Sequence, residues 1–419
     1  MDDLRIEYDA PNDVYFPGQA VTGKVIIQNR EWIKARFLKI CIHGGAHTHW
    51  SESRSTYRTN TRGERERFTE NVNYNATINY LTGESIAWQS RDGTDRLPAG
   101  TNVFPFAFNL PINCAPSFEG CHGHIRYDVH VELDRPWKFN KKSRKCFSVI
   151  PVFDLNITPT AINPMVNTAS KNTGLILKKG LVTITVNLPK RGYVAGEIMP
   201  ITVNIDNGSK VAVSEVSAKM TQLSHFHASH GNMIGVTAHT HNRNDEKLVA
   251  ESRRVADVPA KSRGQMVLSM KIPAIVPSFN CPIIAVDYCL TVKVSTQQIF
   301  GGGLKCEFPL IIGTIPIRQM NQAAPGAMPT MPSVSAPPYP VVAGASASQA
   351  VYPTAPSAPP ASPGGEAPPS YEESVHGAGK VEDAEAFAPR YPVYNNLPQQ
   401  QNSQLPPEYA PPLPAKSGF

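Results

Sequence analysis

A strict alternation of apolar and polar residues between Ile125 and Leu133 places the strongest constraint on the fold. The apolar positions are Ile125, Tyr127, Val129, Val131 and Leu133, and the polar positions between them are Arg126, Asp128, His130 and Glu132. A period of two over this length predicts a half-buried strand of roughly 30 Å. One face of such a strand must be covered, so the pattern also predicts a second sheet packed against the first.

The residues around this stretch extend the same pattern. Phe104, Phe106, Phe108 and Leu110 alternate before it, and Pro111, Pro116 and Gly120 mark a broad loop between the two alternating segments. No stretch up to residue 318 has helical periodicity with caps, and short strands separated by Gly and Pro are typical of a β-sandwich. The polar segment from Ser51 to Phe68 is predicted to be a hairpin tip or loop.

Two parts of the chain resemble each other, which indicates a duplicated domain. The motif Tyr15-Phe-Pro-Gly18 matches Tyr193-Val-Ala-Gly196, and Asn29 falls where Asn207 falls at the same offset. Pro116-Ser117-Phe118 recurs as Pro277-Ser278-Phe279, and Tyr127 in its long strand recurs as Tyr288. We therefore expect an all-β chain with two immunoglobulin-like sandwiches in tandem, in residues 1–155 and 174–318, joined by a linker over 156–173.

The composition changes after residue 318. In 319–419 Pro and Ala dominate, and β-branched apolar residues are nearly absent. Such a segment cannot bury enough apolar surface to offset its ordering entropy, so it predicts a disordered tail that is partly polyproline II.

Composition also limits the classes of function. The longest apolar runs are too short for a transmembrane helix, and the acidic start MDDLRIEYDA does not resemble a secretory signal. Seven scattered Cys predict reduced thiols in the cytosol, and a net charge of +6 is too small to indicate nucleic acid.

The tail carries two PPxY motifs. The first comprises Pro368, Pro369 and Tyr371 around Ser370, and the second comprises Pro406, Pro407 and Tyr409 around Glu408. Two prolines hold the backbone in polyproline II for an aromatic groove, and the Tyr fills a second pocket, which is the recognition mode of WW domains. The related Pro337-Pro338-Tyr339 lacks the spacer residue.

The distance between the motifs allows one partner to bind both. Tyr371 and Tyr409 are 38 positions apart in the sequence, and a flexible chain of that length spans roughly 35 Å. Two WW domains of one partner could then bind together, with avidity about 10²-fold above a single site.

A basic run follows the long strand. Its members are Arg135, Lys138, Lys141, Lys142, Arg144 and Lys145. Such a run could hold acidic or phosphorylated cargo tails or anionic lipid headgroups through charge-assisted bonds. The alternative interpretation is a solvated basic hairpin turn, and the sequence does not decide between the two.

Histidines and cysteines were considered as metal or catalytic sites. His225 and His227 precede His239 and His241, and two such pairs on facing strands could bind zinc, although surface histidines on a polar hairpin are the commoner explanation. Cys114 or Cys121 beside a His could in principle form a nucleophile pair. No accompanying motif supports either chemistry, so we expect no catalytic residues, no metal and no cofactor.

The quoted segments resemble the α-arrestins, the arrestin domain-containing proteins of the arrestin superfamily. In the first half the resemblance rests on VYFPGQAVTGKVII, LPAGTNVFPFAFNLP, PSFEGCHGHIRYDVHVELDRPWKFN and VFDLN. In the second half it rests on KRGYVAGEIMPITVNIDN, IPAIVPSFNCPIIAVDYCLTV and FPLIIGTIP. The resemblance covers nearly all of residues 5–318.

The resemblance implies an arrestin fold and an adaptor function. Proteins of this family bring WW-domain HECT ubiquitin ligases to membrane receptors or transporters and promote their ubiquitination, endocytosis and endosomal or lysosomal sorting. The resemblance therefore implies a cytoplasmic, non-enzymatic protein that acts at the plasma membrane and endosomes, with the PPxY residues contacting the ligase. The alternative is a trafficking scaffold on the same fold that works independently of ubiquitin.

Overall fold

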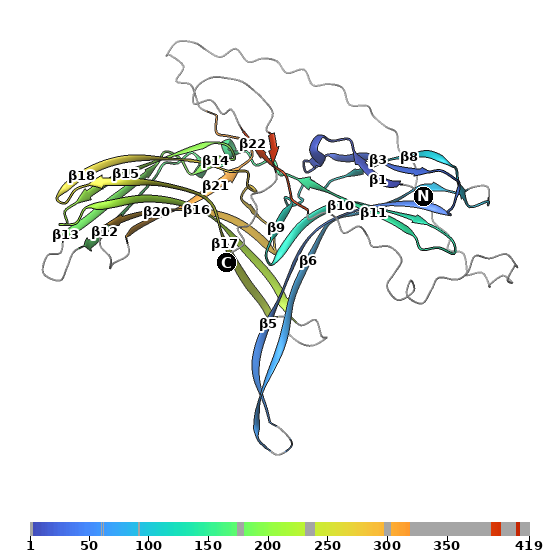
Figure 1. Ribbon diagram of the computed structural model, residues 1–419, viewed down its shortest axis with the longest axis horizontal. Helices are drawn as coiled ribbons and strands as arrows, with labels where there is room; N and C mark the ends of the chain where they lie inside the picture. Colours follow the sequence, from blue (N-terminus) through green and yellow to red (C-terminus); the bar gives the residue numbers. More distant parts are fainter. Residues whose placement is uncertain are drawn as a thin grey trace, which may run out of the picture.

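The computed structural model describes residues 3–59, 61, 63–90, 93–173, 180–230, 239–296, 303–318, 387–394 and 408–410. Two β-sandwiches lie side by side as elongated wings, and two crossed hairpins project from the junction between them (Figure 1). The expectation of an all-β tandem of sandwiches is confirmed. Within the described residues, no helix is long and apolar enough to cross a membrane.

The first sandwich packs a three-stranded sheet in the order β1-β3-β8 on the sheet β6-β5-β10-β11-β2. Its strands are β1 (Asp3–Tyr8), β2 (Val14–Tyr15), β3 (Ala20–Asn29), β4 (Ile33–Lys34), β5 (Phe37–Thr59), β6 (Arg65–Gln89), β7 (Arg96–Leu97), β8 (Gly100–Asn109), β9 (Phe118–Gly120), β10 (Gly123–Asp134) and β11 (Lys141–Val149). The alternating stretch forms the middle of β10, and its apolar residues are fully buried between the layers.

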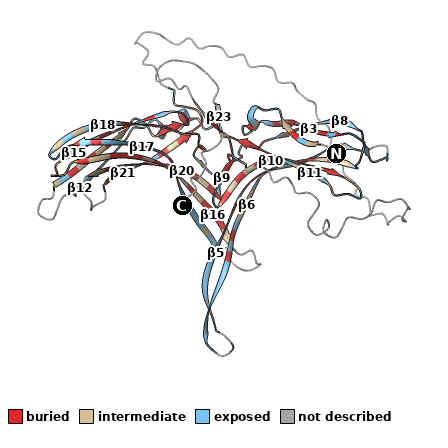
Figure 2. Ribbon diagram, viewed as in Figure 1, coloured by how far each residue is buried: buried red, intermediate tan, exposed pale blue. Residues whose placement is uncertain are grey.

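The second sandwich packs β12-β13-β15-β18 on a sheet in which β16 lies between β17 and β20. Its strands are β12 (Met165–Thr173), β13 (Gly180–Leu188), β14 (Gly192–Val194), β15 (Ile198–Asn207), β16 (Val213–His230), β17 (His239–Val258), β18 (Ser262–Lys271), β19 (Phe279–Asn280), β20 (Ile284–Thr296) and β21 (Leu304–Gly313). Three short 3-10 helices are described: η1 (Pro11–Asp13), η2 (Leu155–Ile157) and η3 (Pro159–Ala161). The buried side chains concentrate between the paired sheets of each wing (Figure 2).

Matching hydrogen bonds in the two sandwiches confirm the duplication. The Tyr127 hydroxyl donates to the Ala115 carbonyl at 2.6 Å, and the Tyr288 hydroxyl donates to the Val276 carbonyl at 2.6 Å. The Asn29 amide donates to the Pro98 carbonyl as the Asn207 amide donates to Pro259, both at 2.9 Å. The matched motifs at Tyr15 and Tyr193 each form a short strand parallel to the last strand of their sandwich.

The sandwiches contact each other after β11 and where the two long ribbons cross. The segment after β11 pairs with the end of the second sandwich, where the Phe153 N–H donates to Thr314 Oγ1 at 2.7 Å and the Thr314 N–H donates back to the Phe153 carbonyl at 2.9 Å. The β5–β6 ribbon also crosses the β16–β17 ribbon, where Thr48 Oγ1 donates to the His227 carbonyl at 2.7 Å. A single bridge between Ser229 and Asn75 connects the two large sheets.

Two expectations need correction. The prediction of a tip or loop over 51–68 is wrong for most of that segment, because β5 continues to Thr59 and β6 begins at Arg65. The predicted linker over 156–173 is too long, because Met165–Thr173 forms β12 at the edge of a sheet. This strand escaped the sequence analysis because an edge strand can be polar on both faces.

The predicted disordered tail lies mostly outside the described residues. Two pieces of it are described, β22 (Tyr391–Val393) and β23 (Glu408–Ala410), which pair antiparallel. Residues 387–394 lie against the body at the junction of the sandwiches (Figure 1). The expectation of a tail without packed structure therefore does not extend to these residues.

Candidate functional site

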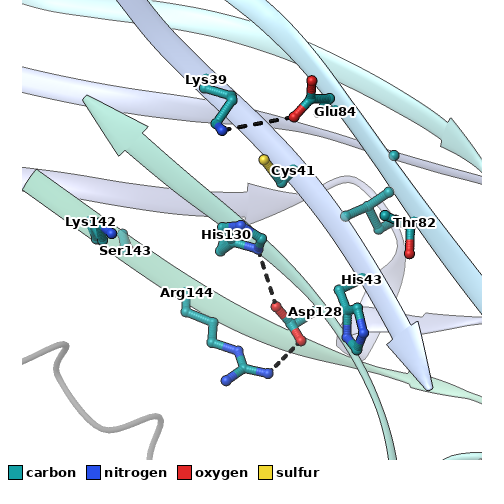
Figure 3. Close-up of a pocket in the computed structure, with 12 residues that line it drawn as sticks. Lys39, Cys41, His43, Thr82, Glu84, Asp128, His130, Lys142, Ser143 and Arg144 are labelled. Carbon is teal, nitrogen blue, oxygen red and sulfur yellow. Dashed lines mark hydrogen bonds and ion pairs between the residues drawn. The ribbon is translucent and has the colours of Figure 1, made fainter. Parts of the chain in front are cut away.

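A pocket of about 730 Å³ opens on the face of the first large sheet that is turned away from its partner layer. Strands β5, β6, β10 and β11 each contribute polar side chains to it (Figure 3). The lining residues are Lys39, Cys41, Ile42, His43, Thr82, Gly83, Glu84, Asp128, His130, Lys142, Ser143 and Arg144. Apart from Ile42 and Gly83, they carry polar or thiol side chains, because the apolar residues that alternate with them point into the core.

Asp128 forms the centre of the charge network in this pocket. Its side chain is buried, and Arg144 Nη2 donates to Asp128 Oδ2 at 2.6 Å, while His130 Nδ1 lies 3.7 Å from Asp128 Oδ1. Burial alone would raise the pKa of this carboxyl, but hydrogen bonds from His130 and Arg144 outweigh it and lower the pKa below the ordinary value. The carboxylate is therefore held charged, and Arg144 is fixed across the pocket floor.

Two more ion pairs line the same surface. Lys39 Nζ lies 3.8 Å from Glu84, and Lys142 Nζ lies 3.5 Å from Glu132. Both lysines are partly exposed, so these pairs are weak and can exchange partners with an incoming acidic group at low cost. The rim of the pocket therefore carries two lysine side chains that can change partners, and its floor carries the fixed Asp128–Arg144 ion pair.

The structure separates the members of the basic run. Lys142 and Arg144 line the pocket, and Lys141 is exposed at the start of β11. Lys145 faces the other way, 3.0 Å from Asp13 and 4.9 Å from the centre of the Tyr8 ring. Arg135 donates to the Phe139 carbonyl, and Lys138 is exposed in the turn before β11. The run is therefore not one continuous basic patch.

The cysteine nucleophile considered from the sequence is disfavoured by its surroundings. Burial raises the pKa of the Cys114 thiol above the ordinary value. Cys121 is exposed, and partial desolvation together with the nearby Asp245 carboxylate raises the pKa of its thiol, so both thiols are favoured in the protonated form. Burial likewise raises the pKa of Cys146, beside the pocket, to about 11. These environments oppose formation of a reactive thiolate.

The histidine pairs do not converge as a zinc site would require. The strand register places His225 opposite Asn244 and His227 opposite Asn242, with ring-to-amide distances of 3.0 and 2.7 Å. His241 lies opposite Ala228, so its side chain points to the other face of the ribbon from His225 and His227. The centre of its ring lies 4.5 Å from the centre of the Tyr74 ring. The side chain of His239 lies outside the described residues, and no group of three or more potential ligands occurs among those described.

Of the six PPxY residues, only Tyr409 falls within the described residues, as part of the backbone of β23. Pro368, Pro369, Tyr371, Pro406 and Pro407 lie outside them.

A tail segment missed by the sequence analysis packs against the body. Tyr391 is 3% exposed, and its hydroxyl donates to the Ser117 carbonyl at 3.1 Å. The Tyr394 hydroxyl donates to the Thr314 carbonyl at 2.7 Å. The available signal was the run FAPRYPVY at residues 387–394, which concentrates aromatic side chains within a segment otherwise rich in Pro and Ala.

Comparison with known families defines the class of protein. Residues 4–156 match the family described as Arrestin (or S-antigen), N-terminal domain, and residues 178–317 match the family described as Arrestin (or S-antigen), C-terminal domain. The two sandwiches are therefore an arrestin N-terminal domain and an arrestin C-terminal domain in tandem.

Individual relatives narrow the class. Arrestin domain-containing protein 17 of Caenorhabditis elegans is 29% identical over 329 residues, covering 77% of this chain and 72% of the relative. Arrestin domain-containing protein 4 of Mus musculus is 30% identical over 323 residues, covering 74% and 70%. Arrestin domain-containing protein 1 of the same species is 29% identical over 260 residues, covering 58% and 54%. This chain belongs to the arrestin domain-containing family, the α-arrestins.

Proposed function

We propose that the chain is a non-enzymatic adaptor that links membrane-protein cargo to WW-domain HECT ubiquitin ligases and thereby promotes ubiquitination, endocytosis and endosomal or lysosomal sorting of the cargo. The observation that carries the proposal is a pair of PPxY motifs in the tail of an arrestin-fold body. Family membership supports the coarser statement, that the chain is an arrestin-fold trafficking adaptor. Such an adaptor would work in the cytoplasm at the plasma membrane and endosomes.

The tail motifs would recruit the ligase. Pro368, Pro369 and Tyr371 form one WW ligand, and Pro406, Pro407 and Tyr409 form the other. Each ligand alone binds weakly, but the connecting chain lets two WW domains of one ligase bind together, with avidity about 10²-fold above one site. Both motifs are therefore expected to contribute to recruitment.

The body would hold the cargo. The pocket on the first sandwich carries two partly exposed lysines, Lys39 and Lys142, whose weak pairs an acidic cargo segment could replace. Other members of the basic run, Arg135, Lys138 and Lys141, would contact anionic lipid headgroups at the membrane surface. Arg144 would act mainly by holding Asp128 in place.

The decisive experiment measures ligase binding to the full chain. The variant carrying both Tyr371→Ala and Tyr409→Ala is expected to lose measurable binding to a tandem WW segment of a HECT ligase, because both motifs lose the tyrosine that fills the second WW pocket. Thermal unfolding of the body should not change. Titration followed by fluorescence anisotropy measures the affinity, and calorimetry measures the unfolding.

The control is Tyr339→Ala, since the Pro-Pro-Tyr sequence at 337–339 lacks the spacer residue. It is expected to bind as the wild type does. If the double variant keeps wild-type affinity for the tandem WW segment, the ligase part of the proposal is wrong. The ubiquitin-independent trafficking scaffold then becomes the better explanation.

A further inference from the structure

The tail segment 389–394 contacts the first sandwich through specific bonds. The Arg390 N–H donates to the buried Ser148 hydroxyl at 3.0 Å, and the Arg390 guanidinium donates to Asn12 Oδ1 at 3.0 Å. The ring of Tyr391 enters the main apolar core, and its hydroxyl reaches the Ser117 carbonyl. Burial of an aromatic ring with a satisfied hydroxyl is the pattern of a specific contact rather than a passing one.

Three residues further on, the same segment contacts the second sandwich. The Tyr394 N–H donates to the Ala195 carbonyl at 3.0 Å, and its hydroxyl donates to the Thr314 carbonyl. The Tyr394 ring packs on a small apolar cluster of Leu155, Ala161 and Val194. We call the residues that receive the segment the tail seat, and they are Asn12, Ser117, Ser148, Ala195, Gly196 and Thr314.

Gly196 in the tail seat is shaped for this contact. A Cβ at Gly196 would lie 2.0 Å from the Tyr394 carbonyl oxygen, a distance that no side chain tolerates. Its counterpart in the first sandwich, Gly18, has a similar positive φ of +84° against +91°, but a Cβ there would meet only Ile112 Cγ1 at 3.4 Å. The backbone turn alone therefore accounts for glycine at Gly18, whereas the close approach of the tail is an additional requirement at Gly196.

The seated segment also pairs with the second PPxY motif. Tyr391, Pro392 and Val393 of β22 lie opposite Ala410, Tyr409 and Glu408 of β23. The motif tyrosine is thus part of a strand paired to the seated segment. Pro406 and Pro407 come directly before that strand in the sequence.

We propose that the tail seat is a binding site for an extended Tyr-Pro-x-Tyr segment, that residues 391–394 of the chain occupy it, and that this occupancy withholds the second PPxY motif from WW domains. The masking part rests on the proposed function of the motif as a WW ligand. A WW domain takes its ligand as polyproline II with the prolines and tyrosine in its own grooves, and a strand paired to β22 cannot adopt that arrangement. The first motif, around Tyr371, lies outside the described residues.

The pairing of β23 depends on the seating of β22. A two-stranded ribbon is marginally stable alone, so β23 stays paired only while β22 is seated. If the seated form is about 90% populated, the affinity of the second motif for a WW domain falls about tenfold, because only the open fraction can bind. Loss of the seat should therefore raise ligase binding rather than lower it.

The test isolates the second motif in the full chain by means of Tyr371→Ala. Titration with a single WW domain is expected to give an affinity about tenfold weaker than that of a synthetic peptide with residues 400–415. Adding Tyr391→Ala or Gly196→Ala should restore the affinity of the peptide. Adding Gly18→Ala, which introduces the same backbone strain without the clash, should not restore it.

Hydrogen exchange of the full chain tests the seat without any WW domain. The Tyr394 amide should exchange slowly in the wild type and in Gly18→Ala, and at the rate of an unstructured peptide in Tyr391→Ala and Gly196→Ala. Fast exchange at Tyr394 in the wild type would overturn the proposal, as would equal WW affinity of the chain and the peptide. If the peptide itself fails to bind the WW domain, the proposed function is wrong and the masking falls with it, while slow exchange still supports the seat.

Discussion

His124 is a single residue whose ionisation is set by burial. It lies on β10 opposite His47 of β5, with ring centres 5.5 Å apart, and Arg126 and Arg144 are close enough to disfavour a third positive charge. Burial, reinforced by these neighbours, lowers the pKa of His124 to about 4 from an ordinary 6.5. The imidazole is therefore neutral in the folded chain at neutral pH.

The lowered pKa of His124 determines how the stability of the folded chain changes with pH. Between pH 6.5 and pH 4 the unfolded chain binds a proton at this position and the folded chain does not, so stability falls as the pH falls through that window. His124→Gln is expected to flatten the decline of the unfolding midpoint between pH 7 and pH 4.5. A decline in His124→Gln as steep as that of the wild type would contradict this account.

The tyrosine pair at Tyr127 and Tyr288 shows what a single sequence can predict at this scale. Their equivalence was predicted from the apolar–polar alternation of the two strands and from the spacing to the Pro-Ser-Phe motif before each strand. In the structure, each hydroxyl donates to a carbonyl twelve residues earlier in the chain. Tyr391 was not predictable in the same way. Its seat consists of Ser117 and core residues remote in sequence, and no local period marks a residue whose partners are that distant.

At the scale of elements, β11 shows how alternation divides a charged run. Lys142 points into the pocket near Lys39, and Lys145 points to the opposite side of the sheet against Tyr8. The sequence predicted the charges but grouped them as one continuous basic run, because the start of the strand at Lys141 follows no apolar alternation. Pairing with β10 fixes the strand, and that is a tertiary contact.

This division gives a test of the cargo pocket. Lys39→Gln combined with Lys142→Gln is expected to weaken binding of an acidic cargo peptide roughly threefold to tenfold at low salt, since each exposed pair contributes up to about 1 kcal/mol. The loss should shrink at high salt through screening. Lys145→Gln changes the same charge on the other face and should bind as the wild type does. Equal binding by all three proteins would favour the solvated-turn interpretation of the basic run.

The long ribbons β5–β6 and β16–β17 are elements that the sequence predicted only in part. Both large sheets continue beyond their sandwiches into these ribbons, whose outer ends are exposed (Figure 2). The residues of those outer ends are mostly polar. Neither face of these outer ends is covered by a second sheet, so the sequence has no need to alternate apolar and polar residues there. The strands are held by pairing in register with each other, which leaves no period-two pattern to recognise. The same reason hides β12, which is predominantly polar.

At the scale of the whole molecule, the position of the wings depends on a small junction. Thr314 Oγ1 accepts from the Phe153 N–H and donates to the Pro151 carbonyl at 3.1 Å, so one hydroxyl ties the exit of the first sandwich to the end of the second. The carbonyl of the same residue receives the Tyr394 hydroxyl of the seated tail. The junction therefore carries two separable connections, one through the Thr314 side chain and one through its backbone.

Thr314→Val separates these connections, because valine keeps the shape and the backbone carbonyl but removes the hydroxyl. The variant leaves the part-buried Phe153 N–H without its side-chain acceptor, which costs about 1 kcal/mol. With the two sandwiches less tightly coupled, the calorimetric transition should broaden and its midpoint should fall by about 2–4 °C for each kcal/mol lost.

Thr183→Val is the control variant, because Thr183 lies on the outer face of β13, where it bonds to Ser170. Its calorimetric transition should be that of the wild type. Exchange at the Tyr394 amide should stay slow in Thr314→Val, because the tail bonds to the backbone. A transition of wild-type width and midpoint would show that the hydroxyl does not couple the sandwiches.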